Sequence, residues 1–157
     1  MGQVLHFKQR TQTHDNPDIA NLARLAGVAI VIEDLDSPLT KAGLNRTTLQ
    51  HNVERQLSEG GVPVLTLQQA EESDDAAYLV VALRAELHPS GVVASMLNLE
   101  LCEIGFFPRS EERGGCVATW HLNGLWAFDR QRLAEAMNDA VEDGVKRFVK
   151  DFRRANA

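Results

Sequence analysis

Residues 76–128 read AAYLVVALRAELHPSGVVASMLNLELCEIGFFPRSEERGGCVATWHLNGLWAF, and this stretch decides the fold. Apolar and polar residues alternate from Tyr78 to Leu87, a turn follows at residues 88–91, and the alternation resumes up to Leu101. Alternation with a period of two is typical of strands that bury one face, and a short turn between two such strands makes them antiparallel. The stretch therefore predicts a sheet that is mostly antiparallel.

The same alternation predicts which side chains face the core. The inward positions are mostly leucine and valine, with Trp120 in the last strand. The outward positions carry polar groups that we expect on one surface: Arg84, Glu86, Asn98, Glu100, Thr119 and His121.

A strand–helix–strand unit precedes this sheet. Residues 28–32 are apolar on both faces, which favours a strand near the centre of the sheet. Asn45 fits a helix N-cap, and the glycine pair at residues 60–61 fits the end of that helix. The strand expected at residues 62–65 contains Pro63, which cannot donate a ladder hydrogen bond, so we expect this strand at an edge.

The chain closes with one long helix. Apolar residues recur every three or four positions from Leu133 to Phe152, and Asp129 is the expected cap. Gly144 lowers the helix propensity in the middle of this segment, which predicts that another element packs closely against it. We expect loops at residues 38–43 and at the acidic residues 68–75.

Together these elements predict an α/β fold of the α+β type. We expect a two-layer sandwich with a mixed, mostly antiparallel sheet and two main helices on one face. Residues 18–157 form the single domain, and the polar residues 1–17 are expected to be a mobile tail.

Composition limits the classes of partner. The chain has 157 residues, 44% hydrophobic and 24% charged, as in ordinary globular domains. Its net charge of −6 repels nucleic acid, so no nucleic-acid partner is expected. No apolar run approaches the roughly 18–20 residues that span a bilayer. The sequence as it stands contains no signal-peptide pattern, so the expected location is the cytoplasm. If a signal sequence was removed, the expected location is the periplasm or the envelope.

The two cysteines, Cys102 and Cys116, fall in neighbouring expected strands. One disulfide would form between them in an oxidising compartment. We favour two small buried thiols, because free cysteine packs well in cores.

One motif points to phosphoryl chemistry. The apolar strand that ends in Asp34-Leu35-Asp36 resembles the opening motif of haloacid-dehalogenase-type phosphatases. The resemblance implies a Mg²⁺-dependent phosphohydrolase in which Asp34 is the nucleophile and Asp36 is the acid and base. Thr66, at the end of the next strand, would supply the phosphate-binding hydroxyl.

The chain departs from that pattern. Ser37-Pro38 replaces the family's glycine, and no lysine lies between Lys41 and Lys146 to hold the phosphate. The antiparallel hairpins also differ from the parallel sheet of that family. We therefore treat catalysis by Asp34, Asp36 and Thr66 as an alternative hypothesis. A protein without enzymatic activity is favoured over an enzyme.

Other chemistry has weaker signals. The histidines lack ligand spacing, so we expect no metal site, and no cofactor motif is present. Arg84, Glu100 and His121 on the outward face could bind a small polar ligand, a second alternative. Trp126 either caps the core or marks a partner surface.

The order of the elements resembles the small α/β domains of bacterial envelope accessory proteins. These are the N-terminal domain of the Tol-system β-propeller protein, the periplasmic part of the curli secretion channel, and lipoprotein activators of peptidoglycan synthases. The resemblance rests on residues 28–32, on the helix from Gly43-Leu44 to Gly60-Gly61, and on residues 145–152. It implies a domain without catalysis that binds a protein partner or self-associates. The leading hypothesis is therefore a binding or assembly module, in the bacterial envelope if the resemblance holds.

Overall fold

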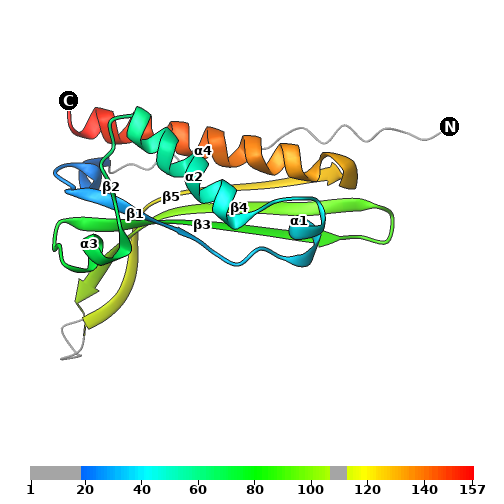
Figure 1. The fold of residues 1–157 in the computed structure, drawn as a ribbon, viewed down its shortest axis with the longest axis horizontal. Helices are drawn as coiled ribbons and strands as arrows, with labels where there is room; N and C mark the ends of the chain where they lie inside the picture. The colour runs from blue at the N-terminus through cyan, green and yellow to red at the C-terminus, as the bar shows by residue number, and fades with distance from the viewer. Residues whose placement is uncertain (1–18, 107–112) are drawn as a thin grey trace.

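The computed structural model describes residues 19–106 and 113–157. The predicted tail, residues 1–17, lies outside these ranges. The elements are η1 (Ile19–Leu22), β1 (Gly27–Ile32), α1 (Ser37–Lys41), α2 (Arg46–Glu59), β2 (Val64–Leu65), α3 (Leu67–Glu71), β3 (Ala76–Leu87), β4 (Val92–Phe106), β5 (Arg113–Asp129), η2 (Arg130–Arg132) and α4 (Leu133–Ala155), as Figure 1 shows.

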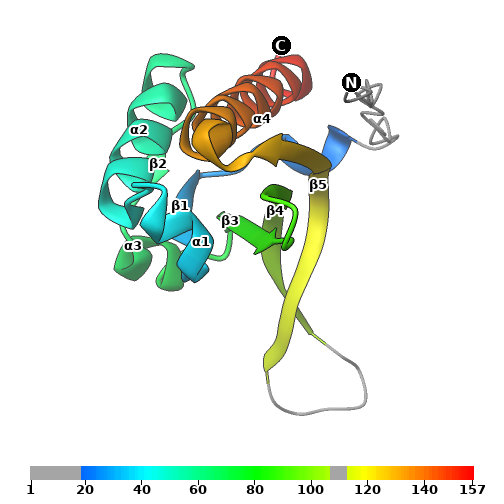
Figure 2. The ribbon, with the colours of Figure 1, turned by 90° about the vertical axis from the view of Figure 1, so that its right-hand side faces the viewer.

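The five strands form one mixed sheet in the order β2-β1-β3-β4-β5. Strand β1 pairs in parallel with β2 and β3, and the β3–β4 and β4–β5 pairs are antiparallel. Helices α2 and α4 lie side by side on one face (Figure 2). The predicted α+β sandwich, with its mostly antiparallel sheet and its two main helices on one face, is confirmed.

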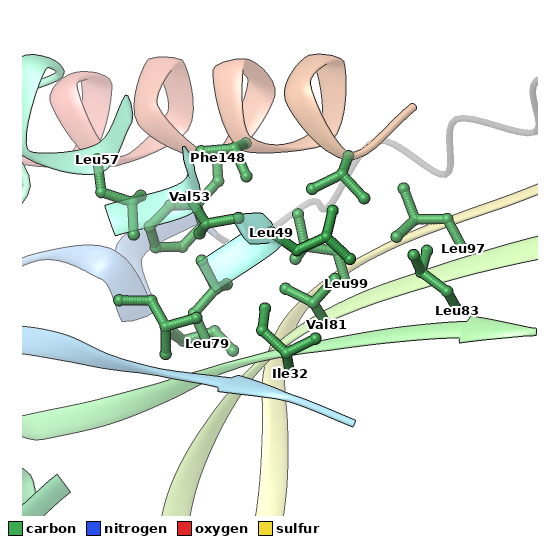
Figure 3. Packing of buried hydrophobic residues seen from close by; sticks show 14 of the residues in the cluster. Ile32, Leu49, Val53, Leu57, Leu79, Val81, Leu83, Leu97, Leu99 and Phe148 are labelled. Carbon is green, nitrogen blue, oxygen red and sulfur yellow. The ribbon is translucent and has the colours of Figure 1, made fainter. Parts of the chain in front are cut away.

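The core fills the space between this inner sheet face and the two helices. Leu79 and Val81 of β3 and Leu99 of β4 point toward Val53 of α2 and Phe148 of α4 (Figure 3). All five side chains are nearly or fully buried. Because successive strand residues point to opposite faces, the alternate residues of β3 and β4 form the outer face of the sheet.

Helix α4 lies very close to the sheet at Gly144, as the sequence predicted. A Cβ atom at this position would lie 3.3 Å from Leu99 Cδ2 and 3.5 Å from Leu97 Cδ2. The missing side chain lets the backbone of the helix come down onto β4. The propensity cost of glycine is thus offset by packing.

Two short helices were not predicted, because each is only five residues long. Helix α1 begins at Ser37, and Pro38 is accommodated because the first turn has no helical acceptor for its missing N–H. Helix α3 begins after Thr66, in the segment expected to be an acidic loop. Its Ala70 packs on Ala29 and Ala76, so α3 covers one corner of the outer sheet face.

Two element boundaries also differ from the predictions. Strand β2 is only Val64–Leu65, because the N–H of Val62 bonds to Leu57 O at the end of α2 and Pro63 has no N–H to donate. It lies at an edge, as predicted. Asp129 does not cap a helix with its side chain; it ends β5, and η2 leads into α4.

The prediction of two free thiols is wrong, because Cys102 and Cys116 form a disulfide between β4 and β5. The register shifts next to Cys102, so that Cys102 lies opposite Ala118 and Cys116 lies opposite Ile104. The two cysteines are diagonal neighbours with a Cα–Cα distance of 5.3 Å, within the usual range for a bridge. The bulge could not be seen in the alternation of the sequence.

One charged side chain of the described residues lies inside the core. Asp151 of α4 is 5% exposed, and its Oδ2 accepts hydrogen bonds from Trp120 Nε1 at 3.1 Å and from Arg147 Nε at 3.2 Å. The indole of Trp120 packs edge-on against Phe148. Asp151 thereby fixes the position of α4 over β5.

Within residues 19–106 and 113–157, no helix has both the length and the apolar character needed to cross a membrane.

We expect Asp151→Ala to lower the free energy of unfolding by about 3 kcal/mol, because it leaves the buried indole N–H of Trp120 without its acceptor and removes an ion-pair partner of Arg147. Urea denaturation followed by circular dichroism measures this change. The control is Asp139→Ala, an exposed aspartate of the same helix, which should change stability by less than about 0.5 kcal/mol. Equal effects of the two variants would contradict the assigned role of Asp151.

Candidate functional site

The loop after β1 holds the two aspartates of the proposed phosphatase motif. Asp34 Oδ1 lies 2.6 Å from Arg46 Nη1 in an ion pair, and its side chain is 94% exposed. The other guanidinium nitrogen of Arg46 donates to Ile32 O at 2.8 Å. Asp34 therefore helps to join the end of β1 to the start of α2.

The remaining members of that motif also have structural partners. Asp36 Oδ2 accepts the backbone N–H of Ala85 at 3.1 Å, and its carbonyl accepts from Leu39 in the first turn of α1. The hydroxyl of Thr66 accepts the N–H of Gln69 in a capping box at the start of α3. Among the described residues, no three His, Cys, Asp or Glu side chains lie close enough to hold a metal ion. The phosphohydrolase stays an untested prediction, and these contacts account for the same residues without it.

The outer sheet face carries most of the polar residues predicted there. The register places Glu100 opposite both Val80 and His121, and Asn98 Nδ2 donates to Glu100 Oε1 at 2.7 Å. Glu86 lies on the same face, opposite Ala94. These residues come together as the alternation predicted.

Two of the predicted residues make other contacts. Arg84 forms an ion pair with Glu33 and donates to the Asp34 carbonyl at 3.4 Å, so its guanidinium binds the loop after β1. Thr119 lies at the bulge and donates to Glu103 Oε1 at 2.7 Å. Arg84 is therefore bonded to the loop after β1, while Glu100 and His121 lie opposite each other on the sheet. A ligand on this face stays an untested prediction.

No layer formed by the described residues covers most of the outer face. Among the described elements only α3 packs on it, at the corner near β2 (Figure 2). Met96 of β4 and Leu125 of β5 lie opposite each other on this face, 40% and 73% exposed. Apolar side chains of this size on an open sheet are suited to contact with another protein.

Trp126 is on the inner face, at the side of α4. It is partly buried, packs against the core and stacks on Phe128 with a centroid distance of 6.4 Å and an angle of 19°. Its ring lies over Gly124, where a Cβ atom would be only 1.9 Å from the indole. Trp126 therefore covers the edge of the core and also remains accessible in a groove between α4 and β5.

The groove beside Trp126 also contains residues that the sequence analysis did not single out. Glu135, Asp139 and Asp143 follow one another at four-residue intervals on the side of α4 that faces β5. Acidic residues with this spacing share one helix face, so the pattern was present in the sequence. Only the packed structure showed that the face borders an aromatic groove.

A second groove, of about 610 Å³, separates α2 from α4. At its border Lys146 Nζ lies 2.6 Å from Glu142 Oε1. The hydrogen bond and the charge of Lys146 lower the pKa of Glu142, and Glu142 raises the pKa of Lys146. Both side chains are exposed, so this pair adds little to stability.

Comparisons with known proteins identify no family. No family model matches the chain, and no curated protein matches it. Among solved structures, the chain is similar to a PelC dodecamer from Paraburkholderia phytofirmans, with a TM-score of 0.46 and 16% sequence identity. The match covers 86% of this chain and 92% of the PelC chain. A likeness at this level says nothing further about the function of this chain.

We expect Gly124→Ala to move the Trp126 indole out of its position over β5. The clash is with the far end of a side chain that can rotate, so the protein should stay folded and lose about 1–2 kcal/mol of stability. Tryptophan emission should shift to longer wavelength, and quenching by iodide should increase.

The control is Gly115→Ala in the same strand, where no atom lies within 4 Å of the added Cβ. Its emission spectrum should match that of the wild type. An unchanged spectrum for Gly124→Ala would contradict the contact between Gly124 and Trp126.

Proposed function

We propose that this protein is a binding or assembly module without catalytic activity, and that a protein segment pairs with the free edge of strand β5. The observation that carries the proposal is the composition of that edge. Residues 117–128 contain no Lys, Arg, Asp, Glu or Pro. Edge strands of monomeric proteins are normally protected from pairing by charges, prolines or short length.

The two edges of the sheet differ in this respect. Strand β2 has two residues and follows Pro63, so it offers little backbone to a partner. Strand β5 has 17 residues, and no strand among the described residues pairs with its outer side. The short helix η1 lies against part of β5. A partner strand is therefore expected along the C-terminal half of β5, near Leu125.

We also propose that the module works in an oxidising compartment, which is consistent with the bacterial envelope. The disulfide between Cys102 and Cys116 supports this, because structural disulfides persist in the periplasm and outside cells and are rare in reducing cytosol. Cys116 is exposed, so a reducing environment would have access to the bridge.

The edge proposal can be tested by photo-crosslinking in the cells that produce the protein. With p-benzoylphenylalanine in place of Leu125, we expect an adduct with a single polypeptide, either another protein or a second copy of this chain, identified by mass spectrometry. The same probe in place of Leu87 is the control, because Leu87 is also exposed, at 43%, but lies at the end of the central strand β3. No adduct at position 125, or identical adducts at both positions, would contradict the proposal.

The compartment can be tested by thiol labelling and intact mass. We expect the protein from the envelope fraction of its own cells to take up no iodoacetamide before reduction and two equivalents after reduction. Alkylation of both cysteines without reduction, in protein from the cytosol, would contradict the envelope proposal and leave the edge proposal standing.

A further inference from the structure

A groove lies directly beside the open edge of β5. It has a volume of about 420 Å³ and runs between the inner face of β5 and the N-terminal half of α4. Its floor is apolar and includes Leu122, Trp126 and Phe128 of β5. An accessible apolar floor next to an unprotected edge can receive the side chains of a strand that pairs with that edge.

The helix side of the groove is acidic. Among the described residues that line it, Glu135, Asp139 and Asp143 are negative and one side chain, Arg132, is positive. Within the described residues Glu135 and Asp139 form no ion pair, and Asp143 lies 3.8 Å from Lys146 on the exposed surface. The carboxylates of Glu135 and Asp139 are therefore available to a cationic partner, and Asp143 already has one cation at its exposed side.

Along this groove, the spacing of the acidic residues on α4 matches the spacing of side chains on an added strand. Glu135 and Asp143 are eight residues apart, which corresponds to about 12 Å along the helix axis. Strand residues four positions apart point to the same face and are about 13 Å apart. Helix α4 and the C-terminal half of β5 run alongside each other in Figure 1. Cationic side chains four apart on a strand added to β5 would thus reach the two ends of the acidic row.

We infer that the β5 edge and this groove together bind an extended segment of another protein whose inward-facing side chains alternate between apolar and Lys or Arg. The edge supplies backbone hydrogen bonds, Trp126 supplies apolar contact, and the acidic row selects the cations. Long basic side chains suit both surfaces, because their methylene stems pack on aromatic rings while the charged end reaches a carboxylate. The inference rests on the proposed pairing at the β5 edge.

The same charges disfavour β5 of a second copy as the occupant. Two β5 strands paired edge to edge would bring two acidic rows to one side of the joined sheet, and like charges across an interface weaken it. The net charge of −6 adds to this repulsion and attracts a basic partner instead.

The test uses two acetylated nine-residue peptides and the full chain. In the first peptide the odd positions alternate isoleucine and lysine and the even positions are threonine; in the second, glutamate replaces lysine. Calorimetry and tryptophan fluorescence measure affinity. We expect the lysine peptide to bind at least tenfold more tightly than the glutamate peptide, and to lose affinity as salt increases.

The double variant Glu135→Gln/Asp139→Asn should weaken binding of the lysine peptide about tenfold. The matched control is Asp74→Asn/Asp75→Asn, which changes the net charge equally in an exposed loop far along the chain from α4, and it should bind as the wild type does. Trp126→Phe should remove the change in fluorescence.

Equal affinity for the two peptides, or unchanged binding by the Glu135→Gln/Asp139→Asn variant, would overturn the inference. A crosslink from position 125 to a second copy of this chain would overturn it too, while the proposed pairing at the edge would stand. Absence of both peptide binding and any crosslink at position 125 would overturn the two together.

Discussion

Helix α4 can lie directly on strands β4 and β5 because residue 144 has no side chain, and the rest of the structure depends on this close approach. It brings Phe148 against Trp120, and it brings Asp151 within hydrogen-bonding distance of the Trp120 indole. A buried carboxylate with two donors tolerates little displacement, so this contact fixes where the helix crosses the sheet. Within the described part of the chain, the same position of the helix leaves the groove beside Trp126 between α4 and the C-terminal half of β5.

The two edge strands of the sheet differ in length. The β2 edge ends after two residues. Strand β5 pairs on one side with β4, and no described strand pairs with its other side, along which residues 117–128 carry no Lys, Arg, Asp or Glu. The disulfide between Cys102 and Cys116 holds the far part of the β4–β5 hairpin in register where that hairpin extends away from the helices (Figure 1). A rigid, uncharged edge has less conformational entropy to lose on pairing than a flexible one, which favours association.

The aspartates after β1 show why a short motif is a weak guide to chemistry. Asp34 and Asp36 follow an apolar strand with the spacing found in a phosphatase motif, and that much is visible in the sequence. Their contacts are with Arg46, twelve residues away, and with the N–H of Ala85, forty-nine residues away. Long-range partners of this kind depend on how β1, α2 and β3 pack, and no local pattern predicts them.

The sequence by itself determined the order and type of the main elements, because alternation with period two and periodicity near 3.6 record which side chains are buried. It also determined the face on which Glu100 and His121 lie, the caps of α2, and the close packing at Gly144. The tertiary structure decided what depends on register and on relative position: the bulge that brings Cys102 to Cys116, the corner covered by α3, and the placement of the acidic row of α4 beside Trp126. Those features join residues far apart in the chain, and their free energy comes from packing that local propensity does not encode.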